Sequence, residues 1–213
     1  IWDKKEIDYG SFHRAMDWSP DGKKLAYAKF HFGGNQSLVN DIKIYDVNNN
    51  KSVWLTESQR ASHPAWSPDG GQIIFVAHKN SVTNLYTVDP DGSNKEQVTH
   101  YTYDTQIIDP HFSPDGKSVI FSMADKDANL DLFILSVATG NVQRITKDLA
   151  ADYNPVWHPD GEYVSFTSHA GGTPNIHTVN IATSESKQIS DVGDAVWAAQ
   201  WSPSDSTLMA TTL

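Results

Sequence analysis

A five-residue turn motif recurs along the chain at a nearly constant interval, and this repeat limits the possible folds more than any other feature. An aromatic residue, Ser or His, Pro, Asp and Gly follow one another at residues 18–22, 66–70, 112–116 and 157–161, and a degraded copy occupies residues 201–205. The aromatic residues of the five copies are 48, 46, 45 and 44 residues apart. A repeat of about this length with four strands per copy is typical of a β-propeller blade.

Each copy predicts the same four strands. A short first segment ends at the aromatic residue, and Pro-Asp-Gly then favours a tight turn, because Pro presets φ and Gly accepts the left-handed conformation. An apolar second strand follows, at residues 24–28, 72–77, 118–122 and 163–167. A third strand starts at an Asp or Asn, at residues 41–45, 84–88, 131–135 and 175–179. A polar hairpin leads to a weaker fourth strand, ending with residues 54–56, 97–99, 144–146 and 188–190.

The second strands indicate how the small sheets pack. They are apolar at nearly every position, as expected for strands that are covered on both faces. One blade cannot bury both of its faces alone, so the copies must pack in series. We therefore predict an all-β fold, a β-propeller of four-stranded antiparallel blades in a single domain over residues 1–213. The repeats fall at approximately residues 13–58, 59–100, 105–147, 150–190 and 195–213.

The two ends of the chain depart from the repeat. The fifth copy supplies two strands before Leu213, and residues 1–9 could add a closing strand to that blade. Two alternatives stay open: a compact five-bladed ring, or part of a longer chain whose propeller has six or seven blades. The mass of the native protein distinguishes them.

Composition narrows the classes of partner. The chain has 16 Lys and Arg against 26 Asp and Glu, and its net charge of −10 argues against binding to nucleic acid or to anionic lipid surfaces. No apolar run approaches the roughly 20 residues that a membrane-spanning helix needs, so direct membrane insertion is not expected. The absence of Cys excludes disulfides, thiolate metal sites and thiol nucleophiles.

The repeat resembles the TolB-type propeller repeat, a WD40-like family. The similarity is closest at residues 63–70 (HPAWSPDG), 89–94 (DPDGSN) and 124–132 (ADKDANLDL), and it extends from residue 13 to about residue 205. The resemblance implies a β-propeller in the bacterial cell envelope or outside the cell, commonly a platform for protein binding. The same repeat also forms the gating domain of prolyl-oligopeptidase-like peptidases and builds some sugar-acid lyases. Membership in such a family fixes the fold better than the function.

The first strand of each blade lines the channel of a propeller, so polar residues on these strands are the candidate binding residues. They are His13, Asp17, His63, Asp109, His111, Asp152 and Asn154. No two His residues have a spacing that enforces a shared metal, so we expect no metal and no cofactor. Two interpretations remain: a channel lining solvated by water, and a site for a small or peptide ligand.

A calcium site has weaker support. Asp125, Asp127, Asn129 and Asp131 place oxygen ligands at alternate positions, as calcium loops do, but the central Gly and the closing Glu of such loops are missing. Each copy also has an Asp or Asn at the position of Asp131, which indicates a structural hydrogen bond. A calcium site at these residues therefore stays an alternative to a purely structural turn.

Catalytic motifs are absent from the sequence. No Gly-x-Ser-x-Gly elbow is present, and the Gly-Gly pairs are not followed by a helix that could hold a phosphate. The recurrence of the aromatic residue at one position in each blade favours core packing over a stacking platform. An enlarged loop, expected at residues 30–40, carries Phe30, His31 and Phe32 and is the most distinctive candidate surface for recognition.

These observations predict a non-catalytic interaction or scaffold module in the periplasm or outside the cell, with a protein partner of unknown identity. One alternative is the propeller domain of an enzyme, either a peptidase or a lyase with a metal on the channel-side His residues. Another alternative is a structural subunit of a larger envelope assembly.

Overall fold

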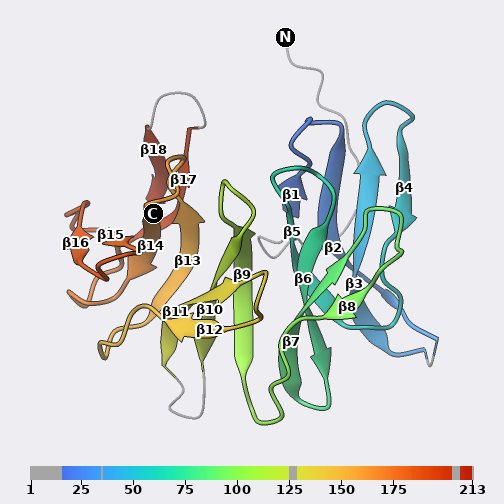
Figure 1. The fold of residues 1–213 in the computed structure, drawn as a ribbon, viewed down its shortest axis with the longest axis horizontal. Helices are drawn as coiled ribbons and strands as arrows, with labels where there is room; N and C mark the ends of the chain where they lie inside the picture. Colours follow the sequence, from blue (N-terminus) through green and yellow to red (C-terminus); the bar gives the residue numbers. More distant parts are fainter. Residues whose placement is uncertain (1–15, 35, 125–128, 203–206, 213) are drawn as a thin grey trace.

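The protein folds into five small antiparallel sheets that follow one another around a common axis. The structure is a computed structural model and describes residues 16–34, 36–124, 129–202 and 207–212. Figure 1 shows the sheets side by side in chain order, which confirms the predicted all-β propeller with five blades. Within the described ranges, no helix is long and apolar enough to cross a membrane. The expected closing strand at residues 1–9 and the candidate His13 lie outside the described residues.

Among the described residues, four sheets have four strands and the fifth has two, and the strands of each sheet are adjacent in the order of the sequence. The first sheet contains β1 (Met16–Trp18), β2 (Lys24–Phe32), β3 (Leu38–Asp46) and β4 (Lys51–Trp54). The second contains β5 (Ala61–Trp66), β6 (Ile73–Lys79), β7 (Val82–Val88) and β8 (Glu96–Gln97). The third contains β9 (Gln106–Phe112), β10 (Ser118–Ala124), β11 (Leu130–Ser136) and β12 (Val142–Arg144). The fourth contains β13 (Asp152–Trp157), β14 (Tyr163–Ser168), β15 (Asn175–Asn180) and β16 (Ser186–Gln188), and the fifth contains β17 (Val196–Trp201) and β18 (Leu208–Thr212).

The Pro-Asp-Gly turns are closed by hydrogen bonds that the sequence motif itself provides. In the second blade, the Ser67 hydroxyl donates to the Asp69 carboxylate (2.6 Å) and accepts from the backbone N–H five residues on (2.9 Å). The first and third blades repeat this pattern, and the serine hydroxyl in the third lowers the pKa of Asp115 to about 2. In the fourth blade His158 takes the place of the Ser, with its Nδ1 2.9 Å from the Asp160 carboxylate. These bonds specify the turn locally, before any sheet packs.

A second recurring network ties the third strand of a blade to the segment that follows its fourth strand. Asn84 Oδ1 accepts from the Thr99 hydroxyl (3.0 Å) and from the Tyr101 N–H (2.8 Å), and the same hydroxyl accepts from the Leu85 N–H (2.9 Å). The equivalent pairs in the other blades are Asp41 with Thr56, Asp131 with Thr146, and Asn175 with Ser190. The recurring Asp or Asn is therefore structural in each of these blades, as the sequence indicated.

Replacing Thr99 with Val tests this network. The change keeps the size of the side chain but leaves the buried Leu85 N–H without its acceptor and Asn84 Oδ1 with the Tyr101 N–H alone, so we expect a loss of about 1–3 kcal/mol of unfolding free energy. Urea denaturation measures the loss. The same change at exposed Thr102 is the control, and an equal effect of both variants would contradict the structural role.

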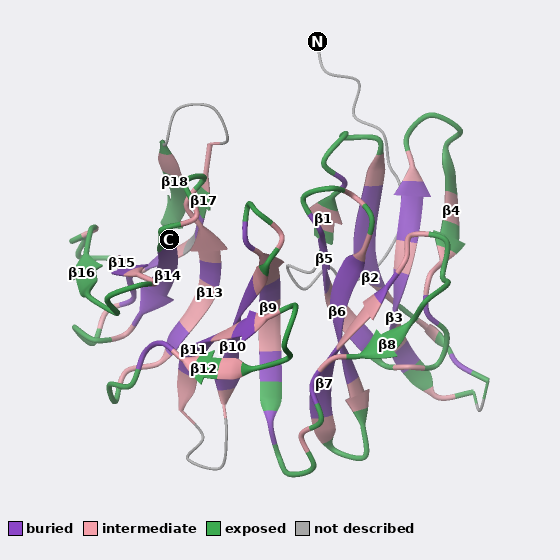
Figure 2. Ribbon diagram, in the orientation of Figure 1, coloured by how far each residue is buried: buried purple, intermediate pink, exposed green. Residues whose placement is uncertain are grey.

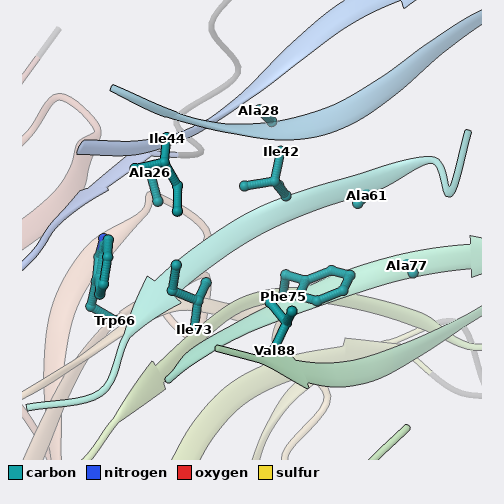
Figure 3. Packing of buried hydrophobic residues seen from close by; sticks show 10 residues of the cluster. All are labelled: Ala26, Ala28, Ile42, Ile44, Ala61, Trp66, Ile73, Phe75, Ala77 and Val88. Carbon is teal, nitrogen blue, oxygen red and sulfur yellow. The ribbon is translucent and has the colours of Figure 1, made fainter. Parts of the chain in front are cut away.

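Apolar clusters between neighbouring sheets hold the blades together. Figure 2 shows that buried residues concentrate on the inner strands, while β4, β8, β12 and β16 are exposed or half-buried. Between the first two sheets, Ile42 packs with Ile73 and Phe75 (Figure 3). On the opposite face of β6, Ile74 and Val76 belong to the cluster with the third sheet. The second strand is thus covered on both faces, as its composition predicted.

The recurring aromatic residue belongs to this core in several blades. Trp66 is buried against the first sheet, and Phe112 and Trp157 each pack on the cluster shared with the preceding sheet. Trp18 is 49% exposed, because in the described part of the chain β1 packs against its own sheet and β5 alone.

The prediction of an enlarged loop at residues 30–40 is wrong. This segment extends the hairpin of β2 and β3, which remain paired at His31 with Val39 and at Phe32 with Leu38. The connection is closed by a hydrogen bond from the Gly33 N–H to the Ser37 carbonyl (2.9 Å). Aromatic and β-branched residues favour strand pairing, so the Gly-Gly sequence marks the tip of a long hairpin and not a loop.

Candidate binding site

The first strands of the five sheets lie next to one another at the centre of the propeller. In chain order, β1 contacts β5, β5 contacts β9, β9 contacts β13 and β13 contacts β17. Each of these strands pairs along one edge with the second strand of its own sheet. Side chains near the ends of the first strands therefore meet around the axis, although successive blades are about 45 residues apart in sequence.

A cavity of about 360 Å³, called the axial cavity below, lies at the ends of the first strands that carry the turns. Its polar lining residues are Asp17, His111 and Gln200, each of which directly precedes the recurring aromatic residue of its blade. Its apolar lining residues come from the third, fourth and fifth copies: Phe112, Pro114, Val156, Trp157, Pro159 and Trp201. Apolar residues outnumber polar ones in this lining, and a cleft with a few convergent polar groups is typical of ligand sites of this size.

Asp17 is the acidic residue of the axial cavity. Its Oδ2 accepts a hydrogen bond of 2.7 Å from the Trp66 N–H, which ties the carboxylate to the second blade. Burial raises the pKa of Asp17, while the Trp66 N–H and the charge of nearby His111 lower it in part. The structure thus brings Asp17 and His111 together, from blades that are two repeats apart.

Three of the candidate residues occupy equivalent positions in the first strands, two residues before the position of Asp17 and His111 in the repeat. His63, Asp109 and Asn154 each precede a Pro and have positive φ values of 50°, 51° and 53°. The first strands carry register shifts at this place, so the residues lie in β-bulges. His63 Nε2 is 3.6 Å from Asp109 Oδ1, which pairs the second and third blades at the axis. Left-handed residues other than Gly are strained, and such positions often aim side chains at functional sites.

Asp152 is placed differently from the other candidates. It starts β13, is fully buried, and does not line the axial cavity. Neither carboxylate oxygen makes a hydrogen bond of good geometry with the described residues. Burial raises the pKa of Asp152 to about 6, and the carboxylates of Asp148 and Asp131 add to this, although the hydroxyls of Ser168 and Thr146 oppose it. The side chain is therefore a buried acid between the third and fourth blades.

Of the candidate residues on the long hairpin, one has a structural role and two are exposed on the surface. His31 Nε2 lies 2.7 Å from the buried Asp41 Oδ2, and its ring packs on Trp54 with centroids 4.2 Å apart. Phe30 and Phe32 are exposed, at 41% and 75%. His31 is thus part of the blade, and the two Phe side chains remain the recognition candidates.

The calcium ligands are described only in part. Asp125 and Asp127 lie outside the described residues. The Asn129 amide donates to the carbonyls of Asp148 and Ala150, and Asp131 pairs with Arg144. In the described ranges, no three His, Asp or Glu side chains gather in a way that could hold a metal ion.

Sequence reasoning named two of the nine described lining residues of the axial cavity, Asp17 and His111, and missed the other seven. Gln200 aligns with Asp17 and His111 in the repeat, so a column-by-column comparison of the five copies would have found it. Trp157 and Trp201 were assigned to the core, but each also forms a wall of the cavity. A large ring can pack on a sheet with part of its surface and line a cavity with the rest.

Comparisons with known proteins agree with the repeat and the geometry. The family model described as the TolB beta propeller domain matches residues 102–212. The chain is 29% identical over 164 residues to the uncharacterized protein Atu1656 of Agrobacterium fabrum, covering 71% of this chain and 53% of that protein. It is 23% identical over 190 residues to the uncharacterized peptidase YuxL of Bacillus subtilis, covering 71% of this chain and 29% of the peptidase.

A solved structure has a similar fold. TolB from Acinetobacter baumannii superposes with a TM-score of 0.73 at 25% identity, over 85% of this chain and 45% of that one. The chain therefore spans about half the length, or less, of these relatives.

Proposed function

The chain belongs to the TolB beta propeller domain family, and from this premise we propose that it is a non-catalytic module that binds a segment of a partner protein in the axial cavity. One observation carries the proposal: the first strands of four blades build a single concave site with apolar walls and three polar groups. The site is formed on strands whose register is set by the blades, so it is held ready for a ligand.

The same proposal includes the cellular location of the protein. The family resemblance and the acidic charge favour the cell envelope or the outside of the cell, where a propeller can act as a platform for assembly. The exposed Phe30 and Phe32 of the long hairpin offer a second contact for the same partner.

Filling the axial cavity is expected to abolish partner binding. Gln200 is exposed on β17 and lines the cavity, so Gln200→Trp places a bulky ring inside it with little strain on the core. Peptides selected from a random library against the native protein should lose at least about tenfold in affinity for this variant, measured by fluorescence anisotropy.

A matched variant identifies the end of the channel that binds. Gln106 is exposed at the opposite end of a first strand, so Gln106→Trp makes the same change away from the cavity. Peptides that bind Gln200→Trp as tightly as the native protein, or that lose affinity only for Gln106→Trp, would contradict the proposed site.

A second candidate function is the propeller domain of a peptidase. The similarity to the peptidase YuxL, which covers only 29% of that protein, favours this candidate. Sequencing the gene on both sides of residues 1–213 tests it, because a hydrolase domain next to the propeller would assign the propeller to an enzyme.

A further inference from the structure

We propose that the axial cavity recognises an organic cation, an ammonium or guanidinium group on an apolar stem, with Asp17 as its counter-ion. This inference rests on the proposed function and names the chemistry of the bound segment. A Lys or Arg side chain of a peptide has this chemistry, and so does a small aliphatic amine.

The charges of the cavity lining support a cationic ligand. Asp17 is the carboxylate among the described lining residues, and these residues include no Lys or Arg. His111 is the other titratable group of the lining. His111 offsets part of the charge of Asp17, but a carboxylate that is taken partly out of water with no Lys or Arg beside it still gains from a ligand that supplies a permanent cation.

The walls of the cavity suit the stem and the head of such a ligand. Phe112, Trp157 and Trp201 contribute three aromatic side chains to the lining. The face of an aromatic ring attracts ammonium and guanidinium groups, and Trp does so most strongly. The apolar part of a Lys or Arg side chain can pack along the same rings while its charged end reaches Asp17.

Two carboxylates that directly follow lining residues in the sequence add to the negative potential. Pro114 and Pro159 line the cavity, and each is followed by the Asp of its turn. The serine hydroxyl of its turn holds the pKa of Asp115 at about 2, and the pKa of Asp160 is lowered by the Glu162 N–H and by His158. Both are therefore ionised at neutral pH. Lys117 lies 3.3 Å from Asp115 and offsets part of this charge.

The charge of Asp17 can be removed without losing the hydrogen bond that it makes within the fold. Its Oδ2 is held by the Trp66 N–H, and an Asn side chain can accept the same bond without the charge. Burial raises the pKa of the free Asp17, and a bound cation lowers it again, so binding should weaken as the pH falls through that raised value.

The test compares two probes that differ only in the terminal ammonium group of the side chain. Nα-acetyl-lysine methylamide and Nα-acetyl-norleucine methylamide are titrated into the native protein, and the indole N–H signals of its Trp residues are followed by NMR. We expect the lysine probe to bind at least about tenfold more tightly than the norleucine probe. In the Asp17→Asn variant this preference should disappear, while exposed Asp104→Asn, the control, should keep it.

The other possible outcomes distinguish the cation site from the proposed function. Equal binding of the two probes to the native protein, or an unchanged preference in Asp17→Asn, would overturn the cation site. Selected peptides that are blocked by Gln200→Trp but need neither a basic residue nor Asp17 would leave the proposed function standing and refute this inference. Butylamine as a third probe identifies the source, because competition equal to that of the lysine probe would point to a small amine.

Discussion

Replacing Asp152 with Asn should abolish most of the decrease in stability that this protein shows between pH 4 and pH 7. Asp152 is fully buried, with a pKa of about 6 against an ordinary value of 3.8. Between these two pH values the folded protein keeps a proton that the unfolded chain has released. The free energy of unfolding therefore falls as the pH rises through this window, by about 3 kcal/mol in total, and the loss is complete above pH 6.

The difference in unfolding free energy between wild type and Asp152→Asn separates the contribution of this carboxyl group from those of the other acids. Thermal unfolding from pH 4 to pH 8 should show the two proteins converging at low pH and Asp152→Asn more stable at high pH. Asp152→Val should behave likewise, because Val196 holds the equivalent place in the fifth blade without a charge. Parallel profiles for wild type and Asp152→Asn would show that the carboxyl is solvated, contrary to its burial.

Truncating Phe121 to Ala should cost about 3–5 kcal/mol of unfolding free energy, the largest effect that we expect from any single change. Phe121 on β10 has no exposed surface, and its ring stacks on Phe133 with centroids 5.9 Å apart. Its cluster also contains Ile74 and Val76 of the second blade. The cavity left by the ring lies between two sheets that cannot close on each other without moving a whole blade.

Hydrogen exchange should show which strands lose stability in Phe121→Ala. Because each blade buries its neighbours, amides of β6 and β10 should lose protection together in Phe121→Ala. Leu149→Ala is the control, since Leu149 is 100% exposed and should change stability by less than about 0.5 kcal/mol. Loss of protection confined to β10 and β11 would show that the blades are independent units.

The candidate site was predictable in part. Asp17 and His111 could be found from the sequence, because the repeat places them on first strands, and first strands surround the axis of a propeller. Gln200 occupies the same repeat position, but that the three side chains share one cavity could not be found, because the repeat gives no angle between blades. Asp152 has the same kind of position in the sequence, yet its side chain turns away from the cavity into the contact between blades.

The sequence alone determined the blade. In the first three blades the Ser and Asp of the motif close the turn with bonds between residues at most five apart. The Asp or Asn of the third strand finds its Thr or Ser about fifteen residues on, so these features need no distant partner. The axial cavity, the raised pKa of Asp152 and the exposure of Trp18 depend on which sheet lies against which. Only the tertiary structure decided them, because burial and electrostatic environment arise from groups that are far apart in the chain.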